Sequence, residues 1–427
     1  MVIAADTPVV GVLPRISVAR FAAILHSSGS PAAGEAQSCW AAVAAEGVDP
    51  LFALAVFAHE SRLGTVGLVP AHDLKNPGAT RTSRTGAGEP VHIAGRGQFW
   101  RYPSWTEGFR DLARRLVDPA FVYRQRRAST IGEIVPLWAP AADGNVPSAY
   151  IASVVTFMNA HAEPELPGVA YRISWIPDGR QNRPGYPMRT QFVTIHETGN
   201  ENPGANAEAH RRFVHAGGGP EGVSFHFVVD DREVVQLLPT IENGWHAGDG
   251  PNGTGNRASI GIELCVNSDG DWERTQANGA LLTAAIVRAF GLSLNAVVPH
   301  QHWSGKFCPR RILTQGFQSY RERVRAALEG RDTMSDVVKV GPFGRHVGHG
   351  FLALWRQLEQ VDTTIPLRVL GWPLTEEFEH DGSVYQIFER GVLKWARSER
   401  PPWDIHLAPL DEAVRVRDVA RARGLLS

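Results

Sequence analysis

The first 160 residues carry apolar side chains that recur with the spacing of α-helices. Asp49-Pro50 is a typical helix start, because Asp accepts hydrogen bonds from the free N–H groups of a first turn and Pro is tolerated there. Apolar residues then repeat at helical spacing over 51–58. Ser104-Trp105-Thr106-Glu107 reads as a capping box and predicts another helix start. We therefore predict a mostly helical domain over residues 15–162.

After residue 162 the pattern changes from helices to strands. A proline-rich stretch at 162–168 is interpreted as a linker. Runs of β-branched or alternating residues predict strands at 191–196, 224–231, 234–238 and 259–267, with a hairpin turn at 230–233. One helix is predicted at 276–290, ended by Gly291. Alternating strands and helices indicate an α/β domain with a mixed sheet over 170–332.

A second, glycine-containing boundary lies at 333–346, and short apolar runs follow it. We predict a small β-rich module over 345–427, which makes the chain a multidomain α+β protein. The module contains four tryptophans: Trp355, Trp372, Trp395 and Trp403. Tryptophan in a small module more often packs in the core than stacks on a sugar ring, so sugar binding by this module stays one of two alternatives.

The composition limits the classes of partner. At 427 residues the chain is too long for a single core. Its net charge of -1 provides no general basic field, so nucleic acid is not an expected partner. We expect no transmembrane segment, because no apolar run approaches the roughly 18 residues of a membrane span. The first residues lack the features of a secretory signal, and three cysteines give no disulfide framework.

The segment 300–309 carries the strongest chemical signal. It places His300 and Cys308 on either side of Lys306, and His196 ends a predicted strand about a hundred residues earlier. Two His and one Cys are a common zinc ligand set that leaves a fourth position open for water. An open position is the mark of a catalytic zinc site, so the pattern indicates a zinc hydrolase.

Glu263 lies within an apolar strand. Ile260, Ile262 and Leu264 fall on one face of this strand, and Glu263 shares the other face with Cys265. A carboxylate in such a strand is costly unless it is paired or used. The alternative for a lone Glu is a solvated residue at the edge of the sheet.

These residues fall in segments that resemble one known family. The segments are NRPGY at 182–186, TIHETGN at 194–200, SFHFVVD at 224–230, WHAG at 245–248, IGIELC at 260–265 and HQHWSGKFCP at 300–309. Residues 170–332 resemble the zinc N-acetylmuramoyl-L-alanine amidases of phage lysins and bacterial autolysins, a family that includes the peptidoglycan recognition proteins.

The resemblance implies a role for each site residue. His196, His300 and Cys308 would bind Zn²⁺, Glu263 would accept a proton from the attacking water, and Lys306 would face the developing oxyanion. It also implies that His246 contacts substrate and that His226 is structural. His302, two residues from His300, aligns with no ligand position.

In the helical region, Glu60 is a candidate acid. On its predicted helix it shares a face with Ala53, Val56 and Phe57, and a carboxyl group among apolar neighbours suits a general acid. The alternative is a helix-end Glu paired with Arg62.

The same region resembles the lysozyme-like glucosaminidase domains that cut the peptidoglycan glycan strand. The matching segments are AHES at 58–61, LKNPG at 74–78, YPSWTEGF at 102–109 and AYI at 149–151. The resemblance implies Glu60 as the catalytic acid and Tyr150 as a site residue. Glycosidases commonly use two carboxylates, and a second is not visible here. An inactive, glycan-binding fold is therefore the alternative.

Together these features predict a modular peptidoglycan hydrolase. The expected reaction is zinc-dependent cleavage of the amide between N-acetylmuramic acid and L-alanine, with glycan cleavage or binding by the N-terminal domain. One rival is a non-catalytic recognition protein, which Cys308 argues against. Another is a zinc peptidase, which the lack of a His-Glu-x-x-His motif argues against. The expected location is the cytoplasm of a phage-infected host before release, or export by a non-standard route.

Overall fold

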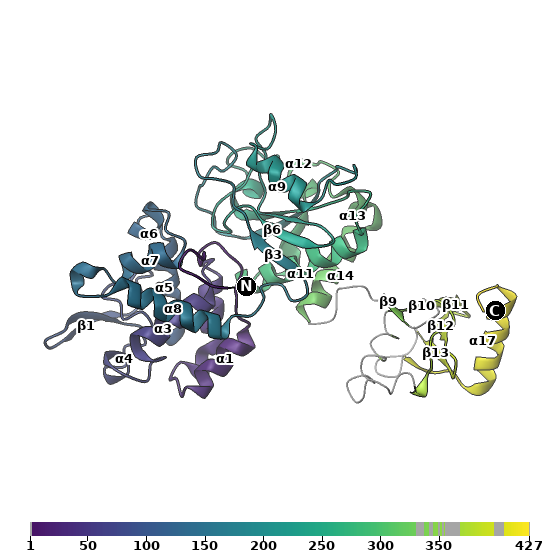
Figure 1. The fold of residues 1–427 in the computed structure, drawn as a ribbon, viewed down its shortest axis with the longest axis horizontal. Coiled ribbons are helices and arrows are strands. Elements are labelled where there is room, and N and C mark those ends of the chain that lie inside the picture. The colour runs from purple at the N-terminus through teal and green to yellow at the C-terminus, as the bar shows by residue number, and fades with distance from the viewer. Residues whose placement is uncertain are drawn as a thin grey trace. The chain divides into compact units, whose positions relative to one another are not determined.

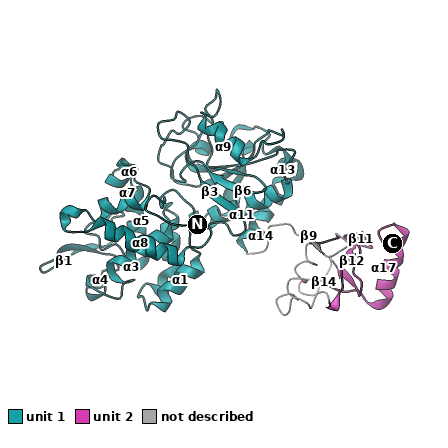
Figure 2. Cartoon of the chain, viewed as in Figure 1, with its two compact units in different colours: residues 1–331 teal, residues 332–427 magenta. Residues whose placement is uncertain are grey.

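The computed structural model describes residues 2–329, 337–340, 345–348, 351, 354, 368–396 and 405–426. The chain divides into two compact units, Met1–Arg331 and Asp332–Ser427 (Figure 2). Within the first unit we call residues 2–162 the helical region and residues 170–329 the sheet region. The division of the chain into domains at 15–162, 170–332 and 345–427 stays a prediction. No helix in the described ranges is both long and apolar enough to cross a membrane.

The helical region is built from eight α-helices and one hairpin (Figure 1). The helices are α1 (Val18–Ser27), α2 (Ala36–Ala44), α3 (Pro50–Ser61), α4 (Leu68–Ala71), α5 (Trp105–Val117), α6 (Val122–Gln125), α7 (Ile131–Trp138) and α8 (Pro147–His161). The antiparallel strands β1 (Glu89–Ile93) and β2 (Gly97–Arg101) form the hairpin, which the helical pattern did not predict. Helix α3 lies at the centre, with residues 50–57 all buried.

Both predicted helix starts are present. Asp49 accepts a hydrogen bond from the Leu51 N–H at the start of α3. Ser104 accepts one from the Glu107 N–H at the start of α5. The Glu107 carboxylate does not complete the predicted box, because it pairs with Arg110 one turn later. Local cap chemistry therefore fixes where these helices begin.

The sheet region is a six-stranded mixed sheet in the order β3-β6-β5-β7-β4-β8. The strands are β3 (Ala170–Ile173), β4 (Phe192–Glu197), β5 (Phe227–Val229), β6 (Glu233–Gln236), β7 (Ser259–Leu264) and β8 (Val297–Pro299). All neighbouring strands run parallel except β5 and β6, which are antiparallel. These two strands are joined by the predicted turn, where the Asp230 side chain accepts hydrogen bonds from the Arg232 and Glu233 N–H groups. The mixed α/β sheet predicted for this region is confirmed.

Helices cover both faces of this sheet (Figure 1). They are α9 (Ala207–His215), α10 (Thr254–Ala258), α11 (Trp272–Phe290), α12 (Gln301–Ser304), α13 (Arg310–Gln315) and α14 (Phe317–Leu328). Helix α11 begins four residues before the predicted position, because Asp271 caps it, and ends at Gly291 as predicted. Ile260, Ile262 and Leu264 pack on the α11 face, while Val228 and Val235 pack on the α9 face. The alternation along β7 therefore turns Glu263 away from the α11 core.

The stretch predicted as a linker is held by ion pairs. The buried Arg15 side chain contacts Asp49 at 2.9 Å and Glu165 at 3.0 Å. Glu163 accepts a hydrogen bond from the Ser17 N–H at 2.6 Å. The Gly11 carbonyl in turn accepts from the Gln236 side chain of β6. The N-terminal segment that contains Gly11 and Arg15 thus connects the helical and sheet regions within one unit.

The second unit contains a hairpin, a small sheet and a helix. The hairpin is β9 (Val337–Val340) with β10 (Arg345–Gly348), and the sheet is β11 (Phe378–His380), β12 (Ser383–Ile387), β13 (Val392–Trp395) and β14 (Ile405–Leu407), all antiparallel. Helix α17 (Leu410–Ala422) packs on it through Val416 and Ala420. Trp372 and Trp395 are half-buried, and Trp395 packs against the core. Trp355 and Trp403 lie outside the described residues.

Candidate metal centre

The predicted ligands come from the ends of the adjacent parallel strands β4 and β8 and from the loop after helix α12. His196 lies near the end of β4, in register with Glu263 on the neighbouring strand β7. On the other side of β4, His300 follows β8 directly, and its N–H donates to the Ile195 carbonyl at 3.1 Å. Cys308 follows α12, and its carbonyl accepts from the Gln301 N–H at 3.0 Å. The carboxyl edge of the sheet is where open α/β folds place their sites.

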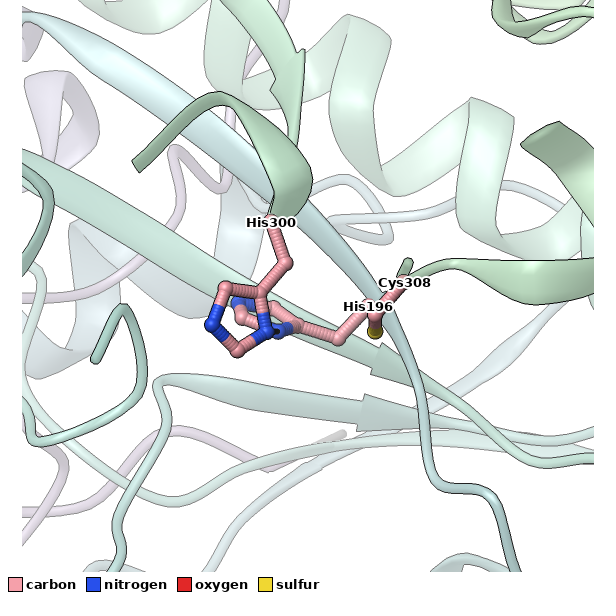
Figure 3. A group of neighbouring side chains, drawn as sticks. All are labelled: His196, His300 and Cys308. Atoms are coloured by element: carbon pink, nitrogen blue, oxygen red, sulfur yellow. Dashed lines mark hydrogen bonds between the residues drawn. The ribbon is translucent and has the colours of Figure 1, made fainter. Parts of the chain in front are cut away.

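His196, His300 and Cys308 form a compact group of side chains that could hold a metal ion (Figure 3). One ligand atom from each lies within 4.8 Å of the others, and all three residues are buried. The two Nδ1 atoms of the histidines are 3.0 Å apart. Zn–N bonds of roughly 2.0–2.1 Å at tetrahedral angles would separate two nitrogens by about 3.3 Å. The spacing therefore fits a zinc ion.

The protonation chemistry of the three ligands also fits a cation. Burial lowers the pKa of His196 and of His300, which keeps both imidazoles neutral with a lone pair to donate. Burial raises the pKa of the Cys308 thiol to about 12. A thiolate in this position needs a compensating positive charge, which a bound metal provides.

Glu263 and Lys306 line the same cavity as the ligands. This cavity has a volume of ≈ 670 Å³, and Phe225 and Trp245 also line it. Glu263 Oε1 is 3.9 Å from His196 Nδ1, and its Oε2 is buried without a hydrogen-bond partner among the described residues. Burial raises the pKa of Glu263 to about 7, against the opposing charge of Lys306. Glu263 is therefore a half-buried carboxylate with one buried, unused oxygen, not a solvated edge residue.

His246 lies behind His196 rather than among the ligands. Its Nδ1 is 3.1 Å from His196 Nε2, and its Nε2 is 3.2 Å from the Ser259 carbonyl. Burial lowers the pKa of His246 to about 3. The ring also lines the cavity, where a substrate contact was predicted. Its two nitrogens already have partners within the protein.

The other two histidines of the motif segments are outside the ligand group. His226 is fully buried: its Nδ1 accepts from the Gly261 N–H at 3.0 Å, and its Nε2 donates to the Glu242 carbonyl at 2.8 Å. His302 is exposed and lies against Trp303 and Phe192. The geometry thus separates His302 from its neighbour His300.

Two residues that position the site were given no role by sequence reasoning. Glu197, directly after His196, accepts hydrogen bonds from the Arg311 and Ile312 N–H groups at 3.0 Å and so holds the chain that follows Cys308. Asn256 accepts from the N–H groups of His246 and Ala247, both at 2.9 Å. Glu197 lies within a quoted motif, so its adjacency to a ligand was an available signal. No sequence pattern around Asn256 indicated its role.

The helical region brings its two predicted site residues together. Tyr150 on α8 donates to Glu60 Oε1 at 2.8 Å, and Trp138 on α7 donates to the same oxygen at 3.2 Å. Burial raises the pKa of Glu60, although both hydrogen bonds oppose the rise. The His59 ring stacks on Tyr150 with centroids 3.8 Å apart. The partners of Glu60 are therefore Tyr150 and Trp138 rather than Arg62.

Known proteins match the sheet region. The N-acetylmuramoyl-L-alanine amidase family model matches residues 186–311. The amidase CwlH of Bacillus subtilis (strain 168) is 49% identical over 145 residues, which cover 34% of this chain and 57% of CwlH. The amidase XlyA of the same organism is 44% identical over 187 residues, which cover 44% of this chain and 60% of XlyA.

The solved catalytic domain of XlyA is 47% identical, with a TM-score of 0.35, over 36% of this chain and 99% of that domain. The chain spans less than two thirds of the length of CwlH and of XlyA. The matched segment contains His196, Glu263, His300 and Cys308, the residues that meet at the edge of the sheet. Residues 186–311 of this chain are therefore similar to the N-acetylmuramoyl-L-alanine amidase family, whose model they match.

Proposed function

We propose that this protein is a zinc-dependent N-acetylmuramoyl-L-alanine amidase that hydrolyses bacterial peptidoglycan. The bond cut would be the amide between the lactyl group of N-acetylmuramic acid and L-alanine of the stem peptide. The observation that carries the proposal is the buried His196–His300–Cys308 group beside Glu263, a carboxylate with an unused oxygen. The family match over the same residues supports it.

The roles of the protein groups follow from their positions. Zinc, when held by His196, His300 and Cys308, would supply Lewis acidity for attack of water on the amide carbonyl. Glu263 would accept the proton of the attacking water and transfer it to the leaving nitrogen as the C–N bond breaks and the new C–O bond remains. A carboxylate whose pKa is about 7 suits both steps near neutral pH. The Lys306 ammonium would stabilise the negative oxygen.

Product analysis tests this proposal. We would digest purified peptidoglycan with the wild type and with Cys308→Ala, and identify the products by mass spectrometry. We expect free stem peptides that begin with L-alanine from the wild type and none from Cys308→Ala. His302→Ala is the matched control, because His302 is exposed and outside the ligand group.

Intact stems after treatment with the zinc-loaded wild type would overturn the amidase proposal and favour a recognition protein. Cleavage within the stem peptide would favour a zinc peptidase.

We propose a second activity, glycan cleavage by the helical region, because Glu60 combines burial with a raised pKa and hydrogen bonds from Tyr150 and Trp138. A carboxyl group that keeps its proton to higher pH than an ordinary Glu suits protonation of a glycosidic oxygen. Counting new reducing ends with Glu60→Gln tests it: we expect a loss of roughly 10²-fold or more. Equal reducing ends from Glu60→Gln and wild type would remove this activity.

Cell-wall binding by residues 345–427 and release from the cytoplasm of a phage-infected host stay predictions. Sedimentation with cell walls after deletion of residues 340–427 would test the first. Unchanged sedimentation of the shortened protein would end it.

A further inference from the structure

The contacts of His246 point to a role in preparing the metal site. We propose that His246 is a positioning residue that holds His196 in the one tautomer and ring orientation that can bind zinc. This inference rests on the proposed zinc site and names a residue that the ligand set does not include.

The argument begins at the backbone carbonyl of Ser259, which can only accept a hydrogen bond. His246 Nε2 lies 3.2 Å from this oxygen, so Nε2 carries the hydrogen. In a neutral imidazole the other nitrogen is then an acceptor. His246 Nδ1 therefore presents a lone pair, and the atom it faces is His196 Nε2, 3.1 Å away.

The tautomer of His246 in turn fixes the tautomer of His196. His196 Nε2 must donate to His246, so the hydrogen of neutral His196 is on Nε2 and its Nδ1 lone pair is free. That Nδ1 is the atom that lies 3.0 Å from His300 Nδ1 in the ligand group. A His246 with hydrogen on Nδ1 would push the hydrogen of His196 onto the atom that must bind the metal. One carbonyl thus sets the tautomers of two histidines.

The position of the His246 ring is itself tightly fixed. The Asn256 side chain accepts from the His246 N–H at 2.9 Å, which holds the backbone. The ring lies directly over Gly261 of β7, where an added Cβ would be 2.7 Å from His246 Cγ. Only glycine leaves room for the ring at this place on the strand. Since both ring nitrogens are engaged, His246 has no free nitrogen to offer a substrate.

Metal binding is the readout that separates this role from a general packing role. Partners of metal-bound histidines contribute about 10- to 100-fold to metal affinity. We would measure zinc affinity by competition with a chelator, and the visible absorption spectrum of the Co²⁺-substituted full-length protein. The variants are His246→Phe, which keeps a ring but no acceptor, and His246→Gln, whose amide oxygen can accept from His196.

We expect His246→Phe to bind zinc about 10- to 100-fold more weakly and to shift the Co²⁺ spectrum, while His246→Gln stays within a few-fold of wild type. His302→Ala controls for loss of a nearby histidine. Gly261→Ala is a second variant, since its methyl group displaces the His246 ring without removing a polar group. It should weaken zinc binding in the same direction.

The outcomes distinguish this inference from the proposed function. If wild type and His246→Phe bind zinc equally well, the positioning role is wrong and the zinc site stands. If His246→Gln is as weak as His246→Phe although both unfold in urea like wild type, the acceptor role is wrong. If the wild type binds neither zinc nor Co²⁺, the proposed zinc site is overturned together with this inference.

Discussion

The helical and sheet regions each contain a half-buried carboxylate with a raised pKa, but the surroundings of the two differ. Glu60 receives two hydrogen bonds on one oxygen, from Tyr150 and Trp138, and these oppose the effect of burial. Glu263 has an oxygen without a partner among the described residues, and the nearby Lys306 acts on it only through its charge. Both would serve proton transfer, in different ways.

The two carboxylates differ in whether they have a buried oxygen that is free to accept a proton or a hydrogen bond. An unpaired buried oxygen is costly in a folded protein, so its persistence indicates a use. Glu263 can accept a proton or a water without breaking an existing hydrogen bond. The hydrogen bonds from Tyr150 and Trp138 to one oxygen of Glu60 fit an acid held in one orientation. The four predictions below test this contrast, in order of decreasing effect.

The largest effect is expected from Glu263→Gln. The amide keeps the shape of the side chain and cannot accept the proton of the attacking water. We expect release of stem peptides to fall by about 10²- to 10⁴-fold while bound zinc is unchanged. Steady-state assays with purified peptidoglycan, with zinc content measured on the same samples, check this. Activity within a few-fold of wild type at full zinc would remove Glu263 as the base.

The second prediction uses His226, a neutral buried histidine of the sheet region. Burial lowers its pKa to about 4, against opposing contributions from Glu242. Because the unfolded chain takes up a proton near pH 6.5 and the folded protein only near pH 4, stability is lost as pH falls through this window. The loss is about 3 kcal/mol by linkage.

His226→Gln keeps an amide that can bond to the Gly261 N–H and the Glu242 carbonyl but cannot titrate. Urea unfolding at pH 7.5 and pH 4.5, with a chelator present, checks the prediction. We expect the pH dependence of the unfolding free energy to be smaller in the variant. Identical slopes for the two proteins would contradict it.

The sequence predicted the local elements well, because they depend on neighbouring residues. Alternation placed Glu263 opposite the isoleucines of β7, and Asp49 and Gly291 marked helix ends. The candidate metal ligands were implied by resemblance, and their convergence depends on the pairing of β4 with β8 and on the loop after α12, which no local pattern predicts. The contact of His246 with His196 could not be predicted, since it spans 50 residues and depends on how one loop folds over Gly261.

Long-range ion pairs were missed for the same reason. Arg15 is 34 residues from Asp49 in sequence, and it appears in the chain as an ordinary charged residue after Pro14. Its burial between Asp49 and Glu165 is decided by the packing of the two regions. Burying an unpaired charge is costly, so an arginine whose partners are unknown is predicted to lie on the surface. The linker interpretation of 162–168 failed to anticipate these contacts.

The third prediction concerns Glu60, whose effect on stability changes with pH in the opposite direction from that of His226. The pKa of Glu60 is raised in the folded protein. The unfolded chain therefore loses this proton at lower pH, and the folded protein loses stability as pH rises above the ordinary pKa of Glu. Glu60→Gln should gain stability relative to wild type from pH 4 to pH 7. Urea unfolding at both pH values checks it, and a difference that does not grow with pH would contradict it.

The smallest effect is expected from Tyr150→Phe, which removes one hydrogen bond to Glu60 and keeps the ring stacked on His59. Loss of one such bond should cost about 1 kcal/mol of unfolding free energy. Because this bond lowers the pKa of Glu60, its loss should raise that pKa further and shift the alkaline limb of any glycan-cleaving activity to higher pH.

Tyr320→Phe in the sheet region is the matched control, since it loses one buried hydrogen bond to Thr283 at 3.0 Å and should cost a similar free energy. Urea unfolding and the pH profile of reducing-end release, measured for both variants, separate the two effects. A shift of the profile in Tyr150→Phe alone would tie the hydrogen bond to the acid. Equal profiles in both variants would mean that Tyr150 stabilises the fold without changing the pKa of Glu60.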